Sequence, residues 1–182
     1  IALGIGWNFL FIGGTTLALS LALLNKTKAD NPAKSATFFT SLTDFADPGP
    51  LKSFIDEGFI SGIVIEAQRK GYLDQRIMAR TFSYLRPNDL VYGPAVKAYL
   101  LGEARPKFDL LFWNGDDTNL PGPMFCWYLR NTYLENKLRE PGATVQCGEP
   151  VDFGAVEVPA FLYASREDHI VPWQTAYKST EV

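Results

Sequence analysis

The apolar residues near the start of the chain fall into a short run followed by a longer one. Residues 9–12 are entirely apolar, Gly13 and Gly14 follow, and residues 15–24 are uncharged and mostly apolar. The first run and the glycine pair predict a buried strand and a tight turn, and the second run predicts an apolar helix. In some α/β folds such a strand–turn–helix unit carries the nucleophile.

Three further segments have the apolar, β-branched and aromatic composition of strands. They are residues 35–45, 108–113 and 159–164. The first is predicted to be a central strand that ends in Asp44, and the last a short buried strand. Clusters of Pro, Gly, Asn and Asp predict turns at 47–50 and 119–123.

Apolar residues at three- and four-residue spacing predict helices in other segments. These segments are residues 51–60, 63–70, 73–85, 90–101 and 124–138. The last has the clearest apolar face, formed by Phe125, Tyr128, Leu129, Thr132 and Tyr133. The segment of approximately 50–105 is helical and irregular, with no clear strand. We interpret it as a cap inserted into an α/β fold.

Composition narrows the class of protein further. The chain has 182 residues, of which 47% are hydrophobic, and a net charge of −3. This length fits one domain, and the charge gives no electrostatic reason to expect nucleic-acid binding. With two cysteines and one histidine, we expect neither a disulfide framework nor a metal site, and no cofactor is predicted. The chain starts at Ile1 and stops just after a predicted helix start, so we expect a fragment of a longer protein.

Residues 1–25 carry no charge, which raises the alternative of a membrane span. Asn8 and four glycines interrupt this stretch, and no basic residue precedes it as in a signal peptide. We therefore expect a buried strand and helix here, and no transmembrane span.

Four side chains are candidates for chemistry from local sequence. Asp168 follows the strand predicted at 159–164, where catalytic groups gather in open α/β sheets, and it suits the acid of a nucleophile–His–Asp triad. His169 is adjacent to Asp168, and neighbours in sequence rarely form a base–acid pair. Cys126 lies near the start of a helix but among apolar residues, and Cys147 precedes Gly148 in a loop. Both cysteines are interpreted first as reduced structural thiols.

Several long motifs carry a resemblance to a known family. They are IGGT at 12–15, SLTDFADPG at 41–49, FIDEG at 54–58, TFSYLRPNDLVY at 81–92, FDLLFWNGDDTNLPGP at 108–123, CWYLRNTYLENKL at 126–138 and SREDHIVPW at 165–173. Through these motifs the chain resembles the polyhydroxyalkanoate synthases, most closely those that polymerise short-chain (R)-3-hydroxyacyl-CoA.

The resemblance implies a partial α/β-hydrolase fold, with residues 1–182 as part of one catalytic domain and approximately 50–105 as a mainly helical cap. It implies an acyltransferase that uses a Cys-His-Asp triad and a cysteine acyl-enzyme, and that releases CoA as the polyester grows. It also implies a homodimer of the full-length protein, located in the cytoplasm at polyhydroxyalkanoate granules.

The family's site residues map onto this chain incompletely. Asp168 matches the triad acid, and the family's base lies beyond Val182. His169 matches a family position that is not the triad base, and it is a substrate-binding candidate. Aligned from IGGT, Phe11 occupies the position of the nucleophilic cysteine of G-[FY]-C-[IV]-G-G-T, and Ile12 supplies the backbone amide of the oxyanion hole.

Aligned instead from residues 2–5, the cysteine position falls on Gly6, so neither register provides a cysteine. A local sequence error and a real substitution both explain this. The sequence therefore predicts a polyester synthase. The alternative is a catalytically degenerate paralogue that binds a synthase or the granule surface.

Overall fold

Two parallel strands and a set of helices make up the part of the chain that the computed structural model describes. The described residues are 15, 18–24, 33–85, 87–104, 118–168 and 170–182. Residues 18–24 are helical, as predicted. The strands predicted at 9–12 and 108–113 lie outside the described residues.

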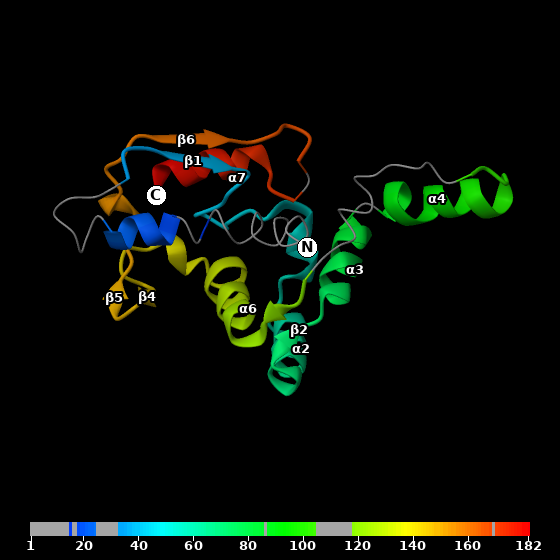
Figure 1. Cartoon of the computed structure of the whole chain (residues 1–182), viewed down its shortest axis with the longest axis horizontal. Helices are drawn as coiled ribbons and strands as arrows, with labels where there is room; N and C mark the ends of the chain where they lie inside the picture. The colour runs from blue at the N-terminus through cyan, green and yellow to red at the C-terminus, as the bar shows by residue number, and fades with distance from the viewer. Residues whose placement is uncertain (1–14, 16–17, 25–32, 86, 105–117, 169) are drawn as a thin grey trace.

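The central pairing joins segments more than 120 residues apart in sequence. Strand β1 (Ala36–Phe39) runs parallel to β6 (Ala160–Tyr163), with Ala36 opposite Ala160 and Phe39 opposite Tyr163 (Figure 1). Parallel strands need a long crossover, and here the crossover contains most of the helices. The mixed α/β class expected from sequence is confirmed.

Strand β1 is shorter than predicted, because a turn replaces its second half. Thr40 has a φ of 45°, which takes the chain out of the extended conformation. Its amide still donates to the Tyr163 carbonyl oxygen at 2.8 Å. Residues 40–45 are therefore a loop, and the prediction of one strand over 35–45 was wrong beyond Phe39.

The two faces of this strand pair differ in burial. Ala36 is buried and Phe38 packs against the main core, whereas Phe39, Phe161 and Tyr163 on the opposite face are 49–62% exposed. Alternate residues of a strand point to opposite faces. The prediction that 159–164 is a buried strand was therefore wrong in its burial, because four of these six residues are exposed and none is fully buried.

Helix α2 (Glu57–Lys70) begins and ends at residues suited to those positions. Asp56 is extended and its Oδ1 accepts from the Phe59 amide at 2.9 Å, as an N-cap does. Gly71 has a φ of 78° at the other end, where glycine is favoured because it has no Cβ. The Asp56 cap also explains why the helix predicted over 51–60 is split: a 3₁₀ helix, η1 (Gly49–Phe54), precedes the break.

A short antiparallel pair connects α2 to the later part of the chain. Strand β2 (Tyr72–Leu73) pairs with β3 (Leu120–Pro121), and helix α3 (Gln75–Leu85) follows β2. The turn predicted at 119–123 was wrong, because residues 120 and 121 form a strand. Helix α6 (Gly122–Leu129) begins directly after β3.

Gly122 allows α6 to approach the end of α2 closely. Its amide donates to the Gly71 carbonyl oxygen at 3.1 Å. A Cβ on Gly122 would lie 2.8 Å from the Ala67 carbonyl oxygen, which is closer than van der Waals contact allows. The absence of a side chain at this position therefore sets the spacing of the two helices.

Helix α6 continues into a π-helical turn, η4 (Arg130–Leu134). The predicted apolar face is confirmed, since Phe125, Tyr128, Thr132 and Tyr133 are buried and Leu129 packs against the core. The helix stops four residues before the predicted end, because Asn136 is left-handed with a φ of 47°. A 3₁₀ turn, η5 (Lys137–Arg139), follows it.

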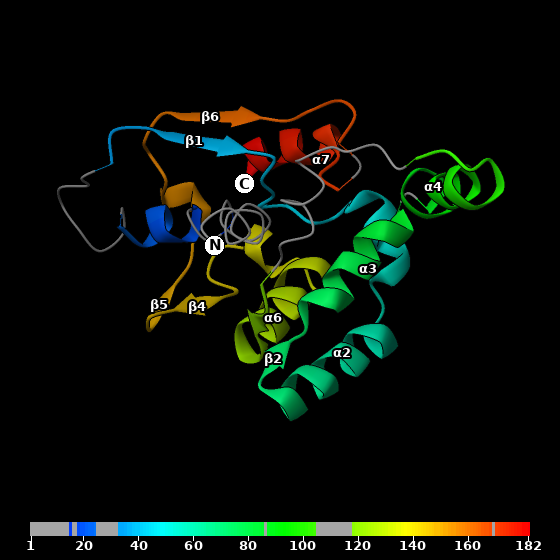
Figure 2. The same cartoon turned by 45° about the vertical axis from the view of Figure 1, so that its right-hand side comes forward.

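The segment after α3 forms a helical arm. It consists of η2 (Asn88–Tyr92), α4 (Gly93–Ala95) and η3 (Val96–Leu100), and it extends away from the other helices (Figures 1 and 2). The helix predicted at 90–101 is confirmed, although it begins two residues earlier.

The final third of the described chain returns to the strand pair. A hairpin of β4 (Val145–Gln146) and β5 (Glu149–Pro150) is followed by the 3₁₀ turn η6 (Phe153–Ala155) and by β6. Helix α7 (Trp173–Lys178) and the 3₁₀ turn η7 (Ser179–Glu181) come last. Figure 2 shows α7 beside β1 and β6.

The described residues form two apolar clusters. The larger one includes Ala18, Ala22, Phe45, Val171 and Ala176, and so combines the early helix, the loop after β1 and the end of the chain. The smaller one is formed by Leu73, Leu120 and Phe125, between α3 and α6. Leu129 packs against both.

We expect Gly122→Ala to lower the free energy of unfolding by about 1–3 kcal/mol, because the new methyl group overlaps the Ala67 carbonyl oxygen. Gly62→Ala is the matched control: it lies inside α2 with no atom within 4 Å of the added Cβ. Alanine has the higher helix propensity, so this change should raise stability by about 0.5–1 kcal/mol. Urea unfolding of both variants measures the difference, and equal effects would contradict the close-approach argument.

Candidate functional site

Thr15, the first residue after the glycine pair, is fixed by two buried hydrogen bonds. Its Oγ1 donates to the Leu42 carbonyl oxygen at 2.8 Å, and its side chain also bonds to that of Tyr128. The predicted strand and glycine turn of residues 9–14 are called the elbow below. The start of the helix that follows the elbow is thereby attached both to the loop after β1 and to α6.

Burial governs the chemistry of this contact. Tyr128 is almost completely buried, and the loss of hydration raises the pKa of its phenol above the ordinary value, although the hydrogen bond to Thr15 works in the opposite direction. The phenol therefore stays protonated at neutral pH.

The loop at residues 40–47 is attached to the end of the chain as well. The Thr43 amide donates to Ser179 Oγ at 3.0 Å, and Thr175 Oγ1 donates to the Asp47 carbonyl oxygen at 2.6 Å. Thr175 is fully buried. This loop therefore contacts the first described residue, α6 and α7 together.

Asp44 holds the loop in its conformation from inside. It is 2% exposed, and its Oδ1 accepts from the Ala46 amide at 2.9 Å and from Asn136 Nδ2 at 2.8 Å. Its Oδ2 lies 3.3 Å from a guanidinium nitrogen of Arg139. A buried carboxylate is tolerated when it is paired and hydrogen-bonded in this way.

Asn136 makes a second hydrogen bond to the same loop, in which its Oδ1 accepts from the Phe45 amide at 2.7 Å. Its left-handed backbone, which ends the preceding helix, turns its amide toward the loop. Asn is among the few non-glycine residues that adopt this conformation readily. The residue that ends the helix therefore also fastens the loop.

Asp168 lies in a tight loop after β6. Its Oδ1 accepts from the amides of Ile170 and Val171, both at 2.9 Å, and its own amide donates to the Ser165 carbonyl oxygen at 3.3 Å. The side chain is half-buried. The hydrogen bonds that the structure describes for this carboxylate all go to Oδ1, so it is held in a fixed orientation.

The acid-bearing loop and the segment after the predicted elbow meet at one apolar cluster. Val171, three residues after Asp168, packs in the same cluster as Ala18, Ala22 and Leu42. The structure therefore brings the Asp168 loop and the elbow helix to a common core. The other predicted site positions, Phe11, Ile12 and His169, lie outside the described residues and stay predictions.

The two cysteines have different environments. Cys126 is half-buried in α6, and desolvation by burial raises the pKa of its thiol, so it is a poor nucleophile at neutral pH. Cys147 is exposed between β4 and β5 with a left-handed φ of 52°. Neither cysteine is described in contact with Asp168.

Within the described residues, no group of three or more His, Cys, Asp or Glu side chains could hold a metal ion. In the same part of the chain, no helix has both the length and the apolar composition needed to cross a membrane.

Sequence reasoning missed the structural role of Asp44 and Thr15. Asp44 was expected only as the last residue of a strand, because nothing local indicates a partner 92 residues away. Its signal was a carboxylate close to the apolar residues Leu42 and Phe45, and a carboxylate buried among such residues requires a partner.

Comparison with known proteins shows which proteins the chain is similar to in sequence, a question that the geometry alone leaves open. The chain is 51% identical over 176 residues to the poly(3-hydroxyalkanoate) polymerase subunit PhaC of Cupriavidus necator, covering 93% of this chain and 29% of that relative. It is 43% identical to the poly(3-hydroxyalkanoate) polymerase of Methylorubrum extorquens, with 93% and 28% covered. It is 36% identical to poly(3-hydroxyalkanoate) polymerase 2 of Ectopseudomonas oleovorans, with 92% and 30% covered.

The chain thus spans less than a third of the length of these relatives. No family model matches it.

We expect Asp44→Asn to lower the free energy of unfolding by about 2–3 kcal/mol, because a neutral amide weakens two charge-assisted hydrogen bonds and turns an NH₂ toward a donor. The control is Asp47→Asn, three residues away, where the carboxylate is exposed and bonds only the Gly49 amide. This change should stay within about 0.5 kcal/mol. Equal urea midpoints for the two variants would show that Asp44 does not organise the loop.

Alkylation with iodoacetamide should distinguish the two thiols by pH. At pH 7 we expect Cys147 to react first, because it is exposed. Cys126 should react only as the pH rises above the ordinary thiol pKa, since burial raises its own pKa and the thiolate is the reactive form. Mass spectrometry of the labelled peptides measures both rates. Faster labelling of Cys126 at pH 7 would contradict the raised pKa.

Proposed function

Because the chain is a homologue of the poly(3-hydroxyalkanoate) polymerases over 93% of its length, we propose that it is part of a polyester synthase. Its substrate is an (R)-3-hydroxyacyl-CoA, and its reaction transfers the acyl group to a growing polyester chain with release of CoA. The observation that carries this proposal is the 51% identity to a polymerase subunit.

The fold that we propose for the full-length protein is the α/β-hydrolase fold. Three features support it: the parallel pairing of β1 with β6, the helix at 18–24 after the glycine pair, and an acid on the loop after β6. The segment of approximately 50–105 is the cap. In its described part the only strand is β2, of two residues, and the rest is mainly helical.

Asp168 is the acid of the triad in this proposal. Its Oδ1 is occupied by two loop amides, and Oδ2 is left to accept the N–H of the histidine that the resemblance places beyond Val182. An acid in this position fixes the orientation of the imidazole and stabilises its protonated form. His169 contributes to substrate binding instead of acting as the base.

The nucleophile belongs at position 11, with the Ile12 amide as an oxyanion donor. In a complete site the cysteine thiolate attacks the thioester carbonyl carbon, the carbon–sulfur bond to CoA breaks, and the acyl group becomes attached to the enzyme. The chain-end hydroxyl then attacks this acyl-enzyme and gives its proton to the histidine. Phe11 cannot form the acyl-enzyme.

Phe11 is the specific observation that favours a second candidate function. A paralogue without the thiol would keep the fold and bind an active synthase or the granule surface. For either function we propose a homodimer of the full-length protein, located in the cytoplasm at granules.

The deciding experiment measures CoA release from (R)-3-hydroxybutyryl-CoA by the full-length protein, as encoded and as Phe11→Cys. We expect the Phe11→Cys protein to exceed the encoded one by about 10³-fold or more, because a missing triad member removes most of the rate. Equal activity of the two would show that the position of the nucleophile is wrong, and Cys126 would be tested next. No release by either would favour the non-catalytic paralogue.

In the Phe11→Cys background, Asp168→Asn should lower kcat by about 10⁴-fold, because the histidine loses its orienting acid. Glu167→Gln is the matched control, since this neighbouring carboxylate is exposed and should leave kcat unchanged. Similar losses in both variants would remove Asp168 from the triad.

A further inference from the structure

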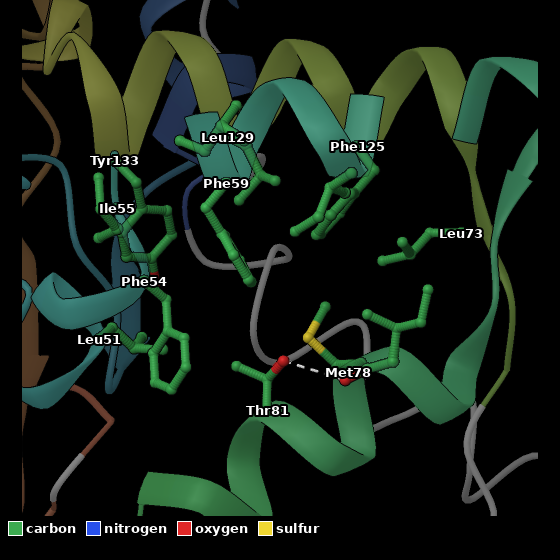
Figure 3. A pocket seen from close by; sticks show the side chains of 13 residues that line it. Leu51, Phe54, Ile55, Phe59, Leu73, Met78, Thr81, Phe125, Leu129 and Tyr133 are labelled. Atoms are coloured by element: carbon green, nitrogen blue, oxygen red, sulfur yellow. Dashed lines mark hydrogen bonds between the residues drawn. The ribbon is translucent and has the colours of Figure 1, made fainter. Parts of the chain in front are cut away.

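An apolar cavity of about 60 Å³ lies among η1, α2, α3 and α6. Figure 3 shows the surrounding side chains directed toward a common space, with Phe125 and Leu129 from α6 on one side and Met78 and Thr81 from α3 on the other. It is separate from the Asp168 loop, none of whose residues lines it.

None of the described residues that line this cavity has a charged side chain. The Thr81 hydroxyl donates within its own helix, to the Ile77 carbonyl oxygen at 3.0 Å. Burial raises the pKa of the Tyr133 phenol well above its ordinary value, so that this group is neutral as well. The lining therefore favours a group without charge, because a carboxylate would lose its hydration without gaining a partner.

Water is a poor occupant of such a space. A buried water needs two to four polar partners, and the one polar group from α3 is already bonded within the helix. Apolar cavities of this kind stay dry or bind small apolar molecules. The volume matches an alkyl group of a few carbons.

The cavity is also accessible. Phe59 lines it and is 40% exposed, and its ring lies against that of Phe54, with centroids 5.7 Å apart. The cavity lies where the two apolar clusters meet: Leu51 and Tyr133 belong to the larger one, and Leu73 and Phe125 to the smaller. Junctions between packed units are common positions for ligand sites.

We propose that this cavity is a binding site for the short alkyl end of an uncharged ester or thioester. Naming the ester and the thioester rests on the proposed acyltransferase function, whereas binding of an alkyl group rests on the cavity alone. Two molecules of the proposed reaction carry such an alkyl end. They are the donor thioester, in its acyl group, and the polyester already formed.

Ligand binding to the cavity can be measured through the NMR signals of the methionines. There are two, Met78 and Met124, and only Met78 lines the cavity. The 182-residue chain labelled with carbon-13 at its methionine methyl groups should therefore give one reporting signal and one internal reference in an NMR spectrum. We expect ethyl butyrate or S-ethyl thiobutyrate to shift the Met78 signal saturably, while Met124 stays constant.

Butyrate anion, which has the same acyl carbons, should leave Met78 unshifted because of its charge. A shift with the thioester alone assigns the site to the donor, and a shift with the ester alone assigns it to the polymer. Equal shifts show that the alkyl group itself is recognised. No saturable Met78 shift with either compound, or parallel shifts of both methionines, would overturn the proposal.

Position 81 offers a matched pair of variants. Thr81→Val preserves the shape of the side chain, and the Met78 shift should persist. Thr81→Leu extends into the cavity, and the apparent affinity should fall by about tenfold or more. Unchanged affinity in Thr81→Leu would place the ligand elsewhere. The binding measurement requires no turnover, so its failure and a failure of CoA release are distinguishable.

Discussion

The buried carboxylate of Asp44 is the constraint on which the described core depends. A charge at this depth must have all its partners in place, and these come from its own loop and from the end of the helix that begins at Gly122. Once the loop is fixed, its backbone can accept from Thr15 and Thr175 and donate to Ser179. One acid thus determines the relative positions of three distant segments.

If the proposed function holds, this arrangement shows how side chains that take no part in the reaction would hold the site for acyl transfer in place. The helix after the elbow is attached through Thr15, and the acid loop is attached through Val171 to the same cluster. Small displacements of catalytic groups cost large factors in rate, so that such indirect support matters as much as the reacting groups. The hydrogen bonds that hold the Asp168 loop are present in the described residues, whereas the role of position 11 stays a proposal.

The helices α2, α3 and α6 are held together in a different way from the loop around Asp44. Its packing depends on close backbone approach at Gly122 and on large apolar side chains with few polar bonds between them. Large side chains from four directions leave a space that none of them fills. Under the proposed function this space would hold the alkyl end of an ester or thioester, and no residue of the Asp168 loop lines it.

The sequence by itself determined the periodic elements and the residue types available for chemistry. The helices predicted at 63–70, 73–85 and 124–138 follow from local spacing, although the last of them ends at Leu134. The place of Asp168 after a strand predicts its role as the triad acid, and this role stays a prediction. Only the tertiary structure decided where β1 stops, which face of β6 is exposed, and what surrounds Asp44 and the cavity. The physical reason is that periodicity and capping act within a few residues, whereas burial, hydrogen-bond satisfaction and close approach depend on partners far away in sequence.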